Sequence, residues 1–167
     1  LPPKSIGTLL LNYDPVRRAD LGFLRDGLDI ITTDFEMPLK QISVVATIEE
    51  YFEVRSASRG DSVNYPKLEL SDENIDFGKS SADHPKFHTL SLYNGGVDVL
   101  NIRTIKSNCE CVDWDLKKEN IPGGDSTILM IKFDPLNRKG RQFKNITLFT
   151  NDPLNSTRVI SLKAQIP

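Results

Sequence analysis

The sequence predicts an all-β protein, and three observations carry this prediction. Short runs of alternating polar and apolar residues recur along the chain, as expected for strands with one buried face. Clusters rich in Gly, Pro, Asn and Asp separate these runs at short, regular spacing, which is typical of a β-sandwich. No stretch combines sustained helical periodicity with capping residues. We therefore expect a sandwich of short strands.

The strand pattern is most regular in residues 67–167. The alternating run 88–93 ends at Asn94-Gly95-Gly96, and Asn and Gly tolerate the positive φ of tight hairpin turns, so a hairpin is predicted here. Strands are predicted, in chain order, over 68–70, 75–77, 88–93, 99–105, 112–114, 127–133, 146–150 and 158–166, with turns at 121–124, 134–135 and 151–153.

Three segments from the first fifty residues recur later in the chain. They are residues 10–15, 30–34 and 42–48, which resemble residues 130–135, 148–152 and 160–166. The offsets are 120, 118 and 118 residues, so one loop differs in length by two residues. Ordered matches at a nearly constant offset predict a tandem repeat.

The repeat sets the expected domain boundaries. Residues 1–52 correspond to the C-terminal half of a first repeat, 53–66 to a small, polar, turn-prone linker, and 67–167 to a complete domain. We therefore expect this sequence to be a fragment of a longer protein. The expected strands of the first copy lie around 8–13, 28–33 and 41–48. Three strands do not close a sandwich, so the second domain, another chain or an upstream segment must cover their apolar face.

Composition and charge exclude several classes of protein. The 167 residues are 38% hydrophobic and 26% charged, as in ordinary globular domains. A net charge of -2 gives no basic field, so nucleic acid is not an expected partner. No apolar run is long enough to span a membrane. No phosphate-binding loop, dinucleotide fingerprint or nucleophile elbow is present, so we expect neither an enzyme nor a cofactor.

Cys109 and Cys111 are the sharpest chemical feature. In an extended strand, residues two apart point to the same face, so both sulfurs would approach one ligand or each other. Packing as two small buried apolar side chains is the preferred interpretation. A labile disulfide or redox pair is the second. A metal site is the third, and it needs about two further donors.

Other polar features have plainer interpretations. Asp134-Pro135 and Asn151-Asp152-Pro153 contain oxygen ligands suited to calcium, but Asp and Asn before Pro also start turns, which we prefer. The basic cluster 138–141 is interpreted as a solvated hairpin loop. Trp114 is expected in the core or, alternatively, as an exposed anchor for a partner.

Six motifs in order carry a family resemblance. They are Ile75-Asp76-Phe77-Gly78, Leu92-Tyr93-Asn94-Gly95-Gly96, Ser107-Asn108-Cys109-Glu110-Cys111, Ile121-Pro122-Gly123, Phe133-Asp134-Pro135 and Thr150-Asn151-Asp152-Pro153. The sequence resembles ASH-type immunoglobulin-like domains. Residues 70–167 resemble a whole domain, and residues 1–52 resemble half of one. These domains occur in hydin, are related to the major sperm protein fold, and have a bacterial branch of unknown function that is abundant in Bacteroidetes. Glu110, where that branch usually has Gly, and Thr33-Asp34-Phe35, in place of Asn-Asp-Pro, depart from its pattern.

The resemblance implies tandem immunoglobulin-like sandwiches in an exported periplasmic or cell-envelope protein. It assigns structural roles to Phe77, Gly78, Asn94, Gly96, Cys109, Cys111, Pro122, Gly123, Asp134, Pro135, Asn151, Asp152 and Pro153. Ser62 in Asp61-Ser62-Val63 and Ser126 in Asp125-Ser126-Thr127 resemble the O-glycosylation acceptor of Bacteroidetes.

The expected function is that of a non-enzymatic structural or protein-interaction module. Its mechanism would be the display of rigid loops and exposed sheet edges, to which a protein partner or a second copy adds a strand. Edge pairing in a dimer is the specific hypothesis for the incomplete copy. The alternatives are a redox or metal-binding accessory protein that uses Cys109 and Cys111, and a carbohydrate-binding module.

Overall fold

The computed structural model describes residues 4–52 and 64–167, and the chain divides into two compact units, Leu1–Glu49 and Glu50–Pro167. Most of the predicted linker, residues 53–63, lies outside the described residues. In the described part, no helix is both long enough and apolar enough to cross a membrane. The only helix there is the single turn α1, Pro15–Arg18.

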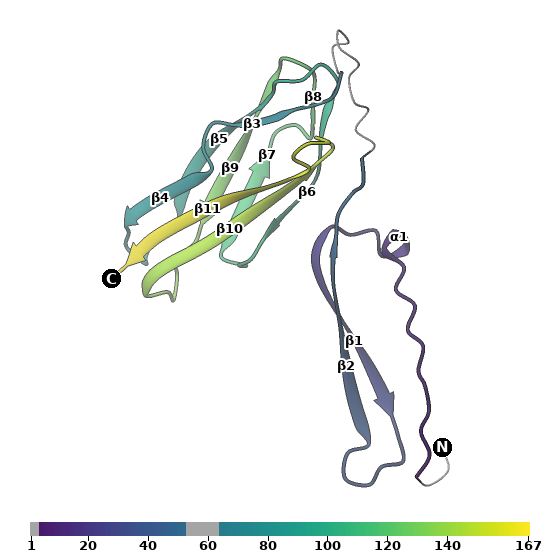
Figure 1. Ribbon diagram of the computed structural model, residues 1–167. Helices are drawn as coiled ribbons and strands as arrows, with labels where there is room; N and C mark the ends of the chain where they lie inside the picture. Colours follow the sequence, from purple (N-terminus) through teal and green to yellow (C-terminus); the bar gives the residue numbers. More distant parts are fainter. Residues whose placement is uncertain (1–3, 53–63) are drawn as a thin grey trace. The chain divides into compact units, whose positions relative to one another are not determined.

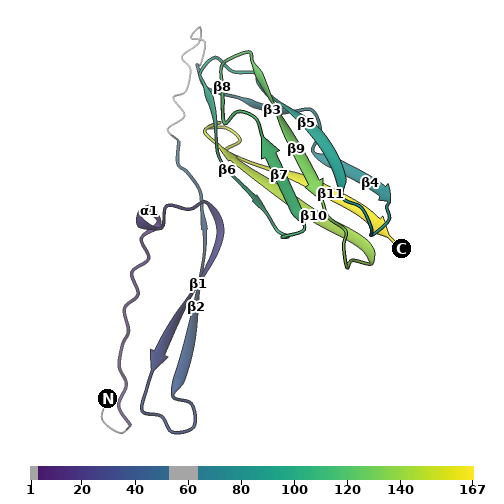
Figure 2. The ribbon, with the colours of Figure 1, turned by 180° about the vertical axis from the view of Figure 1, so that it is seen from behind.

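Unit 2 is a sandwich of two sheets, which Figures 1 and 2 show from opposite sides. One sheet has the strand order β4-β11-β10-β6-β8 and the other the order β3-β5-β9-β7. The strands are β3 Leu68–Leu70, β4 Asn74–Lys79, β5 Lys86–Asn94, β6 Leu100–Ser107, β7 Val112–Leu116, β8 Asn120–Ile121, β9 Ser126–Phe133, β10 Gly140–Thr150 and β11 Thr157–Ile166.

The strand order is that of an immunoglobulin-like domain. The second strand of the domain, β4, leaves the first sheet and pairs in parallel with the last strand, β11, while the other pairs are antiparallel. The orders β3-β5-β9-β7 and β11-β10-β6 correspond to the ABED and GFC sheets of that fold. The predicted strands therefore exist, and the predicted fold class holds for this unit.

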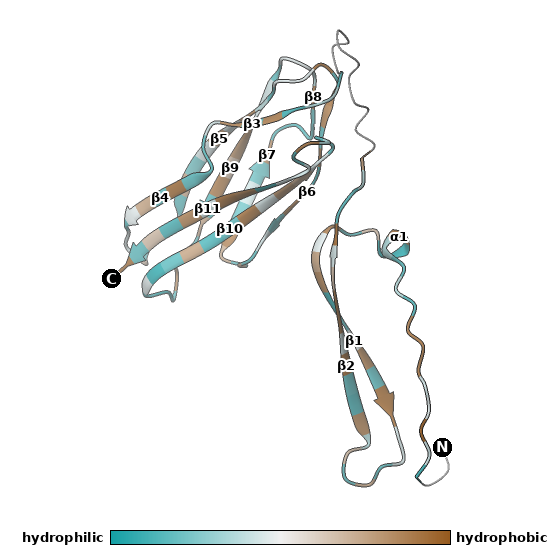
Figure 3. Ribbon diagram, in the orientation of Figure 1, coloured by the Kyte–Doolittle hydropathy of each residue, from teal (hydrophilic) through white to brown (hydrophobic). Residues whose placement is uncertain are grey.

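Period-two alternation forms the core between the sheets (Figure 3). Along β9, residues Thr127, Leu129, Ile131 and Phe133 are buried and their neighbours face outward. Ile160, Leu162, Ala164 and Ile166 do the same along β11. Burial of each Leu, Ile or Phe side chain contributes about 1.5–3 kcal/mol, which explains why the alternation fixes the inward face of every strand.

The Asn94-Gly95-Gly96 segment is not a hairpin, contrary to the sequence-based expectation. It joins β5 in one sheet to β6 in the other, and these two strands do not pair. The basic cluster 138–141 is likewise not a hairpin loop: residues 138–139 lie in the connection from β9 to β10 in the other sheet, and Gly140 and Arg141 begin β10. Turn residues mark where the chain reverses, but the sandwich core decides whether the next strand pairs beside the first or opposite it.

Unit 1 is a long antiparallel hairpin, β1 Gly22–Ile31 and β2 Leu39–Ile48. Its register runs from Gly22 opposite Ile48 to Ile31 opposite Leu39. The β10–β11 hairpin of unit 2 runs from Gly140 opposite Ile166 to Phe149 opposite Thr157. Every pair of the first hairpin, moved by 118 residues, gives a pair of the second.

The predicted strand at 8–13 is absent. Residues 5–14 form no strand, and Leu9, Leu10 and Leu11 are exposed. The matching residues of unit 2 lie in β9, which pairs with β5 on one side and β7 on the other. The described residues of unit 1 contain no counterpart of β5 or β7, so the backbone of 8–13 has no ladder to join.

Candidate functional site

Asp152 is a buried turn residue that ties the last hairpin to the first strand of the domain. Its Oδ2 accepts a hydrogen bond from the Leu68 backbone N–H (2.9 Å), and its Oδ1 accepts from Leu154 (3.0 Å) and Asn155 (3.2 Å). Its side chain is fully buried. Three backbone donors satisfy the carboxylate, so Asp152 acts here as a structural acceptor.

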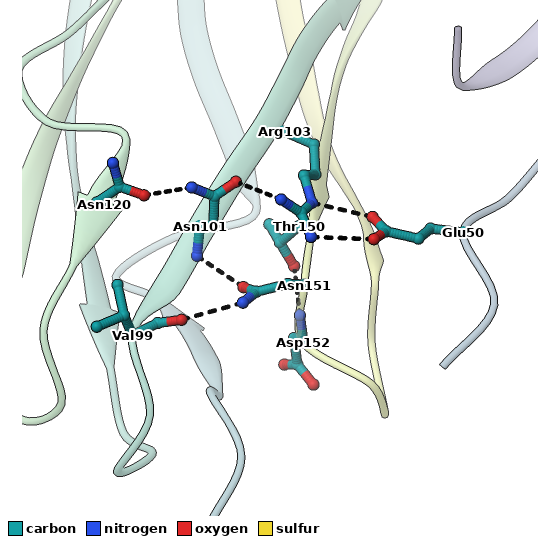
Figure 4. Close-up of polar contacts among 8 residues, drawn as sticks. All are labelled: Glu50, Val99, Asn101, Arg103, Asn120, Thr150, Asn151 and Asp152. Atoms are coloured by element: carbon teal, nitrogen blue, oxygen red, sulfur yellow. Dashed lines mark hydrogen bonds and ion pairs between the residues drawn. The ribbon is translucent and has the colours of Figure 1, made fainter. Parts of the chain in front are cut away.

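Asn151 completes this end of the sandwich by pairing with β6 (Figure 4). Its Oδ1 accepts from the Asn101 backbone N–H (2.6 Å), and its Nδ2 donates to the Val99 carbonyl (3.0 Å). Its own backbone N–H donates to the Asn101 carbonyl (3.2 Å). The amide side chain therefore extends the backbone ladder past the end of the sheet.

A polar row continues outward from Asn101 (Figure 4). Its Nδ2 donates to Asn120 and its Oδ1 accepts from Arg103 Nη1 (3.1 Å). The Arg103 guanidinium also makes a bidentate pair with Glu50, at 3.0 Å from both Nε and Nη2. The two side chains keep about 40% and 34% of their surface exposed. Such a pair contributes at most about 1 kcal/mol.

Asn94 is the central residue of the β5–β6 connection. Its Oδ1 accepts from Lys67 (3.2 Å) and Gly96 (3.0 Å), and its Nδ2 donates to the carbonyls of Asp98 and Ile121 (both 2.8 Å). The side chain is fully buried. Both the oxygen and the nitrogen of the side-chain amide therefore form two hydrogen bonds each, and together they hold four backbone groups of the turn.

Gly96 and Gly123 are required for steric reasons. A Cβ on Gly96 would lie 2.1 Å from the Tyr65 carbonyl oxygen, and one on Gly123 would lie 2.3 Å from the Val97 carbonyl oxygen. Both obstacles are backbone atoms, which cannot rotate away. These two glycines therefore let three loops meet at one end of the sandwich.

The other residues of the family pattern support strands and turns. The ring of Phe77 stacks on Phe133 with centroids 5.9 Å apart. Gly78 has a φ of 61°, which suits glycine. The Asp134 carboxylate accepts from the Leu136 backbone N–H at 3.0 Å, forming the Asp-Pro turn with buried Pro135. Pro122 lies in the turn after β8, and Pro153 in the loop between β10 and β11.

Cys109 and Cys111 form a disulfide with Cα atoms 5.1 Å apart. The expected packing as free thiols is therefore wrong, and a disulfide leaves no thiolate to bind a metal. The residues do not lie in an extended strand either. The Val112 N–H donates to the Cys109 carbonyl (3.1 Å), which closes a tight turn between β6 and β7. Because of this turn the two sulfurs meet, whereas an extended strand would hold them further apart.

The outward face of β4, β11 and β10 carries two neighbouring hollows. Asp76, Lys163 and Phe143 form a row across these three strands, since Asp76 is opposite Lys163 and Lys163 is opposite Phe143. Phe143 is 68% exposed, and a hollow lies on each side of it, of about 430 and 260 Å³. β4 is one of the two edge strands of this sheet. We call this surface the Phe143 face.

Charge on the Phe143 face is mainly positive. Lys79, Arg141 and Lys163 line the larger hollow, and Asp76 is their acidic counterpart. The Gly78 backbone N–H, and then the Lys163 ammonium, hold the pKa of Asp76 below its usual range. None of the sequence motifs points to this surface. The local feature that indicates it is Phe143, an aromatic residue at an outward-facing position of an alternating strand.

The remaining candidate residues do not gather into a site. Trp114 is 36% exposed on the edge strand β7. Ser126 begins β9 and is exposed, and its N–H donates to the Asp125 carboxylate (2.7 Å). Ser62 lies outside the described residues. Within the described ranges, no group of three or more His, Cys, Asp or Glu side chains is placed to hold a metal ion.

Comparison with known families decides the classification of the chain. Residues 68–166 match the family described as "Protein of unknown function (DUF1573)". The chain belongs to this family. The DUF1573 domain thus coincides with the sandwich of unit 2, and the expected relation to a family of unknown function is confirmed. A comparison with curated proteins gives no match.

Solved structures resemble the chain in fold. A protein of unknown function from Porphyromonas gingivalis W83 has a TM-score of 0.66 at 19% identity, over 87% of this chain and 66% of that one. The chain thus spans just under two thirds of the Porphyromonas protein. The PapD-like domain 7 of human CEP192, an ASH domain, has a TM-score of 0.46 at 12% identity, over 71% and 98% of the two chains. The YadV chaperone has a TM-score of 0.44 at 13% identity, over 59% and 51%.

Proposed function

We propose that the chain is a non-enzymatic, immunoglobulin-like protein-interaction module of an exported bacterial envelope protein. The observation that carries the proposal is the Phe143 face beside the edge strand β4. An exposed aromatic residue between two hollows is a typical anchor for a partner. An edge strand offers unpaired backbone groups to an extended peptide. The partner that fits best is an extended segment with apolar side chains for the hollows and acidic residues facing Lys79, Arg141 and Lys163.

The proposed module is repeated. The common register of β1–β2 and β10–β11 supports assigning unit 1 as the C-terminal half of a second such domain. The outward faces of the two hairpins are also alike. Phe23 and Arg25 of β1 occupy the positions of Arg141 and Phe143 of β10, with the aromatic and basic residues exchanged. The two phenylalanines are 69% and 68% exposed.

Further support for the repeat comes from the Porphyromonas protein. Residues 50–167 are less than three quarters of the chain, so a match over 87% must include part of unit 1. We propose that strands equivalent to β3–β8 cover the inward face of the β1–β2 hairpin. The alternative is the edge-paired dimer, in which a second copy supplies that cover.

The proposed location rests on the disulfide. Disulfides form and persist in oxidising compartments, and they are rare in the reducing cytosol. The Cys109–Cys111 disulfide therefore supports an exported protein in the periplasm or cell envelope.

Peptide selection tests the interaction proposal. A displayed library of extended peptides is selected against the whole chain, and the binding of the recovered peptides is measured by titration. Phe143→Ala is expected to weaken binding at least about tenfold, as loss of an aromatic anchor does. Val159→Ala is the control, because Val159 is a 46% exposed residue on the same strand pair away from the row. Equal losses in both variants would overturn the proposal.

A further inference from the structure

The turn that carries the disulfide has the features of an exchange site. Cys109 is only partly buried, while Cys111 is 9% exposed and belongs to the core cluster. One residue separates them, so the closed loop is very short and constrains the unfolded chain little. A disulfide that is accessible and only slightly stabilised by loop closure exchanges more readily than a buried structural one.

Hydrogen bonds distinguish the two sulfurs. The Cys111 backbone N–H donates to Cys109 Sγ at 3.2 Å. This donor stabilises negative charge on Cys109 whenever that sulfur is a thiolate. Cys109 is therefore the more exposed cysteine, which favours attack there, and its thiolate is the better leaving group once it is part of a mixed disulfide.

The backbone of the turn is held independently of the S–S bond. The Cys109 carbonyl accepts from Val112 N–H (3.1 Å) and Ser107 Oγ (3.1 Å), and the Cys111 carbonyl accepts from Asp134 N–H (2.8 Å). Breaking the disulfide leaves these bonds in place. The two thiols would then remain close together, as a reversible pair requires.

Charge around the turn selects the thiol that approaches. A hollow of about 120 Å³ beside Cys111 is lined by Glu110, Asp113, Asp134 and Lys132, three carboxylates against one ammonium. A cationic thiol is attracted to this surface and an anionic thiol is repelled.

We infer that Cys109–Cys111 is a stoichiometric thiol–disulfide exchange site for dithiols that lie beside basic residues. A donor thiolate attacks Cys109 Sγ, the S–S bond breaks, and Cys111 Sγ leaves with the electron pair and takes a proton from water. The donor's second thiolate then attacks the donor sulfur of the mixed disulfide and expels the Cys109 thiolate. The donor becomes a disulfide by losing two electrons, and the cysteine pair becomes a dithiol.

Reduction of the native protein gives the first test. The whole chain is incubated with cysteamine or with 2-mercaptoethanesulfonate, and free thiols are alkylated and counted by mass spectrometry. Reduction by cysteamine is expected to be faster, and the ratio of the two rates should fall at least about threefold when added salt screens the charges. Glu110→Gln should lower the ratio at low salt, whereas Glu119→Gln, an exposed control, should not. A salt-independent ratio, or reduction only as fast as the protein unfolds in urea, would overturn the inference.

Trapping tests the assignment of the sulfurs. Cys111→Ser leaves Cys109 as the only thiol, and it should form a mixed disulfide with cystamine at least about tenfold faster than Cys109→Ser does. Trp114 fluorescence shows whether each variant is folded. Equal rates, or a faster Cys109→Ser variant, would contradict the assigned roles. A negative result in these exchange experiments would not contradict the proposed peptide binding at the Phe143 face, because peptide titration measures that binding separately.

Discussion

Asp34 and Asp152 make the same loop hydrogen bonds in two hairpins that are 118 residues apart. Each carboxylate Oδ1 accepts from the backbone N–H groups two and three residues later: Glu36 and Met37 in one loop, Leu154 and Asn155 in the other. They differ at Oδ2. That of Asp152 accepts from Leu68 in the buried core, whereas that of Asp34 pairs with Lys40 Nζ (2.8 Å) at the surface.

This difference predicts unequal effects of one substitution. Asp152→Asn removes the charge from a buried acceptor of three N–H groups, and it should lower the free energy of unfolding of unit 2 by about 2–3 kcal/mol. Asp34→Asn is the matched control, and it should change this free energy of unfolding by no more than a few tenths of a kcal/mol. Urea denaturation followed by Trp114, the only tryptophan, reports on unit 2. Equal effects would show that the Leu68 contact is unimportant.

The turn after β5 predicts a steric effect. Gly96→Ala should lower the free energy of unfolding by about 2–3 kcal/mol, because its Cβ meets the Tyr65 carbonyl oxygen at 2.1 Å. Gly95→Ala should cost less than about 1 kcal/mol, because the nearest atom there, at 2.7 Å, is the end of the flexible Glu69 side chain. Urea titration of the two variants provides the measurement. A stability of Gly96→Ala equal to that of Gly95→Ala would contradict the geometry.

The lowered pKa of Asp76 predicts an acid dependence of stability. Its folded pKa lies below the unfolded value of about 3.9, so its contribution is complete above that value and is lost as pH falls through the folded pKa. Asp76→Asn keeps an oxygen for the Gly78 N–H but carries no charge. Its melting temperature should therefore fall less than that of the wild type between about pH 5 and pH 2.

Asp125 provides an independent check on this acid dependence. Its pKa is lowered by the Ser126 backbone N–H and by Lys118. The two sites share no partner, so the effects of Asp76→Asn and Asp125→Asn should add. Parallel pH profiles for the wild type and the double variant would contradict the prediction.

The disulfide predicts a small loss of stability on removal. Its closed loop is so short that chain entropy gives it only about 1–2 kcal/mol. Cys109→Ser/Cys111→Ser should therefore remain folded, with the free energy of unfolding from urea denaturation lowered by that amount. Complete unfolding of the double variant at room temperature would assign the pair a larger structural role.

Local patterns were sufficient for much of the fold. The residue patterns along 127–133 and 158–166 predicted the strands β9 and β11, because a strand has a period of two wherever its partner lies. The same patterns did not reveal that Asn94 ends a strand whose successor lies in the opposite sheet. The Phe143 face was also missed, because its row combines residues of three strands that are separated in the chain.

The sequence by itself determined the all-β class and the positions of the turns, since each depends on residues within one short segment. Only the tertiary structure decided which strands share a sheet, that residues 8–13 remain unpaired, that Cys109 and Cys111 are bonded, and that Asp152 holds Leu68. The physical reason is that strand pairing and burial depend on groups distant in the chain. A local pattern indicates that a residue needs a pairing or packing partner, but it does not identify that partner.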